Sequence, residues 1–243
     1  MAKVPKNPEE IFEEFTDDFK KAFGSDLISI ILYGSGASGH YVPGKSDINF
    51  LIVLSEGGID NLEMAFSDVA RWRKRKVAIP LFMTKAEILS SRNTYPIEFL
   101  SMKKHYILVS GEDVLGGLSF EPSHLRLQSE REFRGKLVHL RRGFLEAEGR
   151  TRQIRELIKA SFTAFISIFR ALLYIKGIDI PQARRDIINT VAREYSVDPA
   201  IFLKCADIKE DIDRGADSQI HVVFKDYVRE IEKLSAVVDG MSV

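Results

Sequence analysis

The stretch IILYGSGASGHYVPGKSDINFLIVL, residues 30–54, decides the fold of the first part of the chain. Two short apolar runs, residues 27–33 and 48–54, enclose a segment with four glycines and one proline, residues 34–45. Apolar runs of this length that are rich in isoleucine and bounded by glycine are typical of buried strands. We therefore predict a strand, a glycine-rich loop and a second strand.

The residues that border this loop suit an anionic ligand. Gly34 lacks a side chain, so the backbone there can approach a phosphate closely. Ser35 can donate its hydroxyl, and the backbone N–H groups of Gly34 to Gly36 can form a nest for an anion. Asp47 precedes Asn49 by two positions, and strand alternation places both side chains on one face. The pattern predicts a phosphate-facing site at the end of the first strand.

Gly34-Ser35, the loop and Ser46-Asp47-Ile48-Asn49 together resemble the DNA-polymerase-β-like nucleotidyltransferase superfamily, with bacterial aminoglycoside nucleotidyltransferases as the most similar members. The resemblance covers about the first half of the chain. It implies transfer of a nucleoside monophosphate from ATP or another nucleoside triphosphate to a hydroxyl acceptor, with Mg²⁺ as the metal. The residues it assigns to nucleotide binding are Gly34, Ser35, Gly36, Lys45 and Ser46. The residues it assigns to metal binding and catalysis are Asp47 and Asn49.

The sequence departs from this family at two carboxylates. Asn49 stands where the family has an acid, and it offers an oxygen without a charge, whereas Mg²⁺ favours carboxylates. The third acid of the family lies on a third strand, which here reads VAIPLFM over residues 77–83. Glu98 is a candidate substitute. Two functions stay open: a nucleotidyltransferase with reduced or lost activity, and an inactive nucleotide-binding, regulatory or partner-binding module.

The remaining pattern predicts an α+β protein with a small mixed sheet, helices on one face of it, and an all-helical bundle after it. We expect a nucleotidyltransferase-like domain over residues 1–120 and a helical domain over 121–243. Pro80 predicts an edge position or a bulge for the third strand. The helices we expect in the first part are 8–23, 59–76, 85–90 and 96–103, followed by a strand at 106–109. Those in the second part run from about 122 to 149, and over 151–176, 181–195, 199–213 and 217–238.

The composition is that of an ordinary globular protein. Lys+Arg and Asp+Glu number 35 each, so no basic field indicates a nucleic-acid partner. The N-terminus is polar and acidic, and no apolar run of the sequence approaches the length of a membrane span. With the single thiol of Cys205, these features predict a cytoplasmic protein without a membrane partner. The expected partners are a nucleotide and a small-molecule or protein hydroxyl acceptor, and a homo-oligomer is left open.

Two further patterns have a functional and an ordinary interpretation. Cations crowd residues 126–155, where Arg131, Arg134 and Arg141 lie near one helix face that could meet phosphates; we favour a solvated, partly paired surface. Arg134 and His139 also match the Arg-x4-His spacing of HEPN ribonucleases, as a third and more distant hypothesis. The loop pair His40-Tyr41 could stack on a base, but its default interpretation is an exposed loop.

Overall fold

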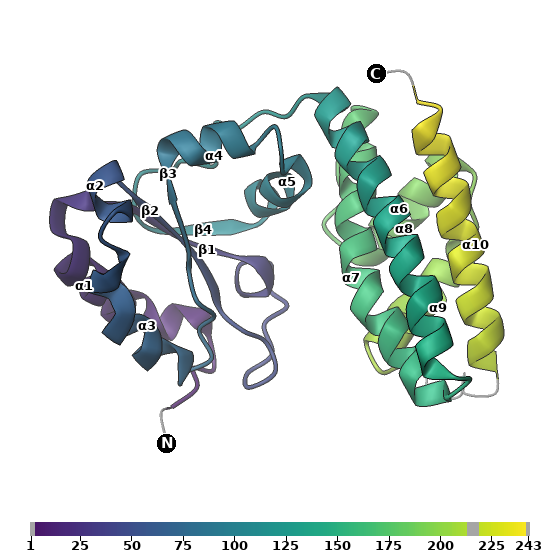
Figure 1. The fold of residues 1–243 in the computed structure, drawn as a ribbon, viewed down its shortest axis with the longest axis horizontal. Helices are drawn as coiled ribbons and strands as arrows, with labels where there is room; N and C mark the ends of the chain where they lie inside the picture. The colour runs from purple at the N-terminus through teal and green to yellow at the C-terminus, as the bar shows by residue number, and fades with distance from the viewer. Residues whose placement is uncertain (1–2, 213–218, 242–243) are drawn as a thin grey trace. The chain divides into compact units, whose positions relative to one another are not determined.

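A computed structural model describes residues 3–212 and 219–241 of the chain. The chain divides into two compact units, Met1–Ser119 and Phe120–Val243 (Figure 1). The first contains the sheet and the second is helical, so the predicted α+β class is confirmed.

The sheet of the first unit is small and mixed. Its strands are β1 (Leu27–Tyr33), β2 (Asn49–Leu54), β3 (Leu81–Thr84) and β4 (Tyr106–Gly111), in the order β3-β2-β1-β4. The central strand β1 pairs antiparallel with both β2 and β4, whereas β2 pairs parallel with β3. The strand–loop–strand arrangement predicted from residues 30–54 is therefore present as the centre of the sheet.

One face of this sheet carries the main core of the unit. α1 (Phe12–Phe23) and α3 (Phe66–Arg73) lie on the same side of it (Figure 1). The ring of Phe15 stacks on Phe50 of β2 with 4.0 Å between centroids. Alternate residues of β2 and the residue before it are fully buried in this core: Ile48, Phe50, Ile52 and Leu54. Residues 47 and 49 therefore belong to the opposite face, as strand alternation predicts.

The prediction of a single helix over residues 59–76 is wrong. The chain forms α2 (Glu56–Ile59), a 3₁₀ turn η4 (Leu62–Ala65) and then α3. Ser55 caps the backbone N–H of Gly58, which starts a helical turn earlier than the hydrophobic pattern indicates. The Asn61 side chain donates to the carbonyl of Gly57 and closes that first turn. Local side-chain bonds of this kind compete with a continuous helix.

The third strand is shorter than predicted and lies at the sheet edge, as predicted. Val77 forms an isolated parallel bridge with Ile48, and the amide of Ala78 donates to the Ile48 carbonyl at 2.9 Å. The ladder stops at Pro80, which has no N–H to donate, and resumes at Leu81 opposite Leu51. The edge position follows from the strand order.

The rest of the first unit follows the prediction closely. α4 (Lys85–Ser91) begins at a capping box in which Thr84 and Glu87 exchange hydrogen bonds. α5 (Pro96–Lys104) begins at a proline in its first turn, where a missing N–H costs nothing. β4 continues to Gly111, two residues beyond the predicted end. In Figure 1, α4 and α5 lie on the other side of the sheet from α1 and α3, so helices cover both faces and not one face as predicted.

The second unit is a bundle of helices. They are α6 (Pro122–Ala147), α7 (Thr151–Ile175), α8 (Arg184–Tyr195), α9 (Pro199–Lys209) and α10 (Ile220–Asp239). The helix predicted over residues 199–213 ends earlier, at Lys209. Residue 213, and residues 217 and 218 of the last predicted helix, lie outside the described residues. The start predicted at Pro181 is wrong, because α8 begins at Arg184.

α7 is the central helix, and it corrects one sequence-based expectation. By length and composition it could cross a membrane, with a mean hydropathy of 1.5, so the chain does contain a sufficiently apolar segment. It packs, however, against α6, α8, α9 and α10. Its aromatic side chains Phe162, Phe165 and Phe169 are fully buried, and Phe169 meets Phe202 of α9 edge-to-face. The apolar composition of α7 is accounted for by its position inside the bundle.

Candidate functional site

The end of β1 forms a tight glycine turn. After Tyr33 the chain enters a 3₁₀ turn over Gly34–Gly36, and Gly34 has a φ of +73°. L-residues adopt such a φ only at a cost, which explains the glycine. The carbonyl of Gly34 accepts from the amides of Ala37 and Ser38 at 3.2 and 3.1 Å. The first N–H groups of such a turn have no partner within it.

This turn lies directly beside Asn49. Tyr33 and Asn49 are register partners in the β1–β2 ladder. A Cβ added to Gly34 would lie 3.3 Å from the side-chain nitrogen of Asn49. The structure therefore places the Gly-Ser turn next to the side chain of the first residue of β2. Gly34 leaves room for the Asn49 amide as well as for a ligand.

Asp47 and Asn49 differ in their surroundings. Asp47 is exposed, and Asn49 is half-buried at the start of β2. The Asn49 side-chain N–H donates to the backbone carbonyl of Asp47 at 3.4 Å. This bond directs the amide nitrogen toward the main chain, so the side-chain oxygen is the atom left for a ligand. The exposed carboxylate of Asp47 carries the only negative charge of the Ser46–Asn49 motif.

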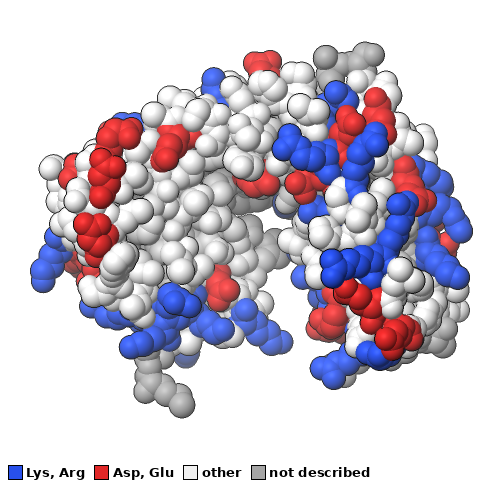
Figure 2. Space-filling view, in the orientation of Figure 1, with Lys and Arg blue, Asp and Glu red and all other residues white. Residues whose placement is uncertain are grey.

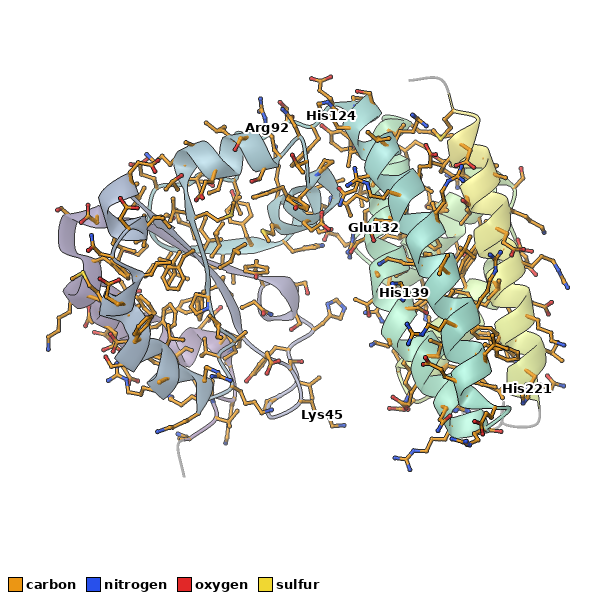
Figure 3. All side chains as sticks on the ribbon, in the orientation of Figure 1. Lys45, Arg92, His124, Glu132, His139 and His221 are labelled. Atoms are coloured by element: carbon orange, nitrogen blue, oxygen red, sulfur yellow. The ribbon has the colours of Figure 1, made fainter. Side chains whose placement is uncertain are left out.

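Ser46 and Lys45 complete the sequence-predicted set. The Ser46 hydroxyl accepts from the amide of Val42 at 3.1 Å, and the Ser46 amide donates to the Val42 carbonyl at 2.9 Å. These two hydrogen bonds join Ser46 to Val42 and close a turn over residues 42–46. Lys45 is exposed at the loop and forms no ion pair within the described part of the chain (Figure 3).

The loop is held by an interaction that sequence reasoning missed. The Tyr41 hydroxyl donates to the carbonyl of Pro5 at 3.0 Å. Partial burial, with the nearby charges of Glu10 and Asp47, raises the pKa of Tyr41. Tyr41 therefore anchors the loop to the N-terminal segment and is not a free stacking platform. His40 is exposed, and its Nδ1 contacts the Ser38 hydroxyl at 3.2 Å.

The segment next to β2, residues 77–79, contains no acidic side chain that could serve as the third acid. Val77 shares the buried core with Ile48, so strand alternation turns Ala78 toward the face of Asn49. Ile79 lies on the other side, against α3. Glu98 is exposed in the first turn of α5. Over residues 3–212 and 219–241, no three or more His, Cys, Asp or Glu side chains are grouped as metal ligands.

Four of the five arginines of α6 pair with acids, and Arg131 forms no ion pair within the described residues. Arg134 pairs with Asp239 at 2.9 Å and with Glu130 at 3.3 Å, and Arg141 pairs with Glu232 at 2.7 Å. These ion pairs support the interpretation of α6 as a solvated, partly paired surface. They also engage Arg134, the arginine of the Arg-x4-His match. A second match of that type with a longer spacer, from Arg214 to His221, begins outside the described residues.

Comparison with known proteins gives a fold similarity only. No family model matches the chain, and no curated protein sequence matches it. The structure is similar to the crystal structure of spectinomycin adenyltransferase AAD(9) from Enterococcus faecialis with ATP and spectinomycin. The TM-score is 0.53 at 14 % sequence identity, and the match covers 93 % of this chain and 100 % of that one. The chain therefore has a nucleotidyltransferase-like fold.

Proposed function

We propose that residues 1–120 form a nucleotide-binding domain of the nucleotidyltransferase fold, followed by a helical domain over 121–243. The Gly34–Gly36 turn holds the phosphates of a nucleoside triphosphate such as ATP, and nucleotidyl transfer is slow or lost. The observation that carries this proposal is the glycine turn at Gly34, with a φ of +73°, next to the exposed carboxylate of Asp47 and beside residues 77–83, which contain no acid.

The donor set decides which metal chemistry is reasonable. Mg²⁺ is commonly held by one or two carboxylates together with substrate phosphates. Asp47, the side-chain oxygen of Asn49 and a bound triphosphate fit one Mg²⁺ of this kind. They do not fit a two-metal site, because Asn49 stands where the family has its second acid and residues 77–83 contain no acid that could serve as the third. A bound Mg²⁺ would neutralise phosphate charge and orient the triphosphate.

Each remaining residue contributes to binding. The hydroxyl of Ser35 and the amides of the turn donate to phosphate oxygens, and Gly34 permits the close backbone approach. Lys45 supplies a positive charge at the loop. Ser46 keeps the loop closed through its two hydrogen bonds with Val42, so its contribution is to position Asp47. No residue of this set is an evident base for the acceptor hydroxyl, which is why we expect weak or no turnover.

The test is nucleotide binding with and without Mg²⁺, measured by calorimetry on the full chain with ATP. We expect binding that Mg²⁺ strengthens and that Asp47→Ala makes insensitive to Mg²⁺. The matched control is Asp17→Ala, which removes an exposed carboxylate of α1 on the other side of the sheet. If ATP does not bind, the nucleotide-binding proposal fails. If Mg²⁺ dependence survives Asp47→Ala, the metal assignment fails.

A second candidate function is residual transfer to a hydroxyl acceptor, favoured by the similarity to an adenyltransferase solved with ATP and spectinomycin. Release of pyrophosphate from ATP, assayed across a panel of aminocyclitol and aminoglycoside acceptors, measures it directly. The variant Asn49→Asp with Ala78→Glu places acids on one face of β2 and its neighbour. A gain in pyrophosphate release by this variant alone would show that the scaffold lacks only carboxylates, whereas activity of the wild-type chain would establish an enzyme.

A further inference from the structure

An apolar groove lies in the first unit between α3 and the outer edge of the sheet. Its volume is about 370 Å³. Two of its large apolar side chains are unusually open to solvent, with Phe66 70 % and Ile79 61 % exposed. The groove is lined by Leu62, Ala65, Phe66, Val69, Ala70, Arg73, Ile79 and Phe82.

The position of the groove is one that proteins ordinarily protect. β3 is an edge strand, so its outer side is not covered by another strand of the sheet. Edge strands present unpaired backbone groups and are usually blunted by charge, by proline or by covering elements. Pro80 blunts only one position of this edge. Exposed Ile79 and Leu81 remain beside it, and exposed apolar surface at an edge indicates an interaction site.

Uncompensated positive charge borders the groove. Within the described residues, Arg73, Lys74 and Lys76 have no acidic partner, in contrast to the neighbouring Arg75, whose guanidinium pairs with Glu14 at 2.5 Å. Figure 2 shows Lys and Arg side chains gathered at the lower end of the first unit, where α3 ends in Figure 1, below a largely uncharged surface. Cations at a helix C-terminus complement its dipole, but the dipole does not explain the apolar surface beside them.

We propose that this groove binds an acidic, apolar segment of another protein. Apolar side chains of the segment fill the space between Phe66 and Ile79, where they remove both from water. Its carboxylates pair with Arg73 and with the lysines that follow it. A second copy of this chain is a poorer occupant, because the copy would bring its own unpaired cations to the same surface and like charges repel.

The test uses a phage-displayed library of random 16-residue peptides selected against the immobilised full chain. We expect enriched peptides to combine at least two large apolar residues with at least two acids. Synthetic, fluorescein-labelled versions are then titrated against the chain by fluorescence anisotropy. Phe66→Ala, which removes an anchor of the groove, should weaken binding about tenfold or more, as is usual for a central apolar contact.

Charge is tested separately. Arg73→Gln with Lys74→Gln should weaken the same peptides and reduce their sensitivity to salt, because screened ion pairs are lost. The matched control is Lys20→Gln with Lys21→Gln, two exposed lysines of α1, which should leave binding unchanged. The proposal is overturned if no peptide is enriched, if enriched peptides lack acids, or if Phe66→Ala binds them as the wild type does. It is equally overturned if sedimentation shows a dimer that Phe66→Ala dissolves.

Discussion

The glycine turn gives the sharpest prediction, because the chain provides its own control. Gly34 and Gly39 lie in the same loop with nearly equal φ values of +73° and +75°. A Cβ at Gly34 would contact the Asn49 side chain at 3.3 Å, whereas a Cβ at Gly39 would have no atom within 4 Å. Gly34→Ala and Gly39→Ala therefore share the backbone strain and differ only in what the methyl group meets.

The strain is about 1–2 kcal/mol for a residue with a side chain in the left-handed region. Both variants should lose this much stability, and Gly34→Ala slightly more because Asn49 must shift. Unfolding in urea can be followed through Trp72, the only tryptophan, which is 1 % exposed in the core of the first unit. The fluorescence therefore reports this unit alone. A loss of about 1 kcal/mol corresponds to a fall of about 4 °C in the melting temperature for a unit of this size.

Nucleotide affinity should separate the two variants. The methyl group at Gly34 blocks the close approach of phosphate to the turn, and one lost hydrogen bond to a charged group costs about 1.5–3 kcal/mol. That corresponds to an ATP affinity lower by roughly tenfold to a hundredfold. Gly39→Ala should bind ATP as the wild type does. Equal ATP affinities in the two variants would refute the assignment of Gly34 to the phosphate site, whatever their stabilities.

Two further predictions concern the fold of the first unit. Gly111→Ala should destabilise it by about 3 kcal/mol, because the new Cβ would lie 2.0 Å from the Ile28 carbonyl, whereas Gly117→Ala, with nothing within 4 Å, should be near neutral in the same urea titration. The pKa of Tyr106 is raised from 10.0 to about 12 by burial and by its hydrogen bond to Asp113. Because the pKa of Tyr106 is higher in the folded protein than in the unfolded chain, the protonated phenol favours the folded state. This contribution to stability is fully present below pH 10 and is lost as the pH rises through about 12. Alkaline unfolding of Tyr106→Phe should lack this step; a pH profile identical to that of the wild type would contradict the assignment.

Features set by neighbouring residues were predictable from the sequence. The two strands around the glycine loop follow from short apolar runs, and the opposite faces of Ile48 and Asn49 follow from alternation alone. Pro80 predicted an edge position or a bulge for β3, because a proline leaves one ladder bond unmade.

Features set by distant residues were not predictable. The bond from Tyr41 to the Pro5 carbonyl joins positions 36 apart and has no local signal. The break at Asn61 depends on a side-chain bond to Gly57 that a hydrophobic pattern does not register. The groove at Phe66 depends on the three-dimensional arrangement of α3 and the sheet edge, whereas the sequence predicts only a continuous helix over residues 59–76.

The arrangement of β2 explains why the fold of the first unit does not depend on acids at the start of this strand. Its core-facing residues, Ile48 and Phe50, are fully buried and pack on α1 and α3, whereas Asp47 and Asn49 face the other way and add little to this core. Two carboxylates at those positions would repel each other unless a cation stood between them. Asn49 removes that repulsion and gains a hydrogen bond to the backbone of Asp47. Asn49 therefore suits the single-metal, nucleotide-binding site that we propose better than a site that holds two metal ions.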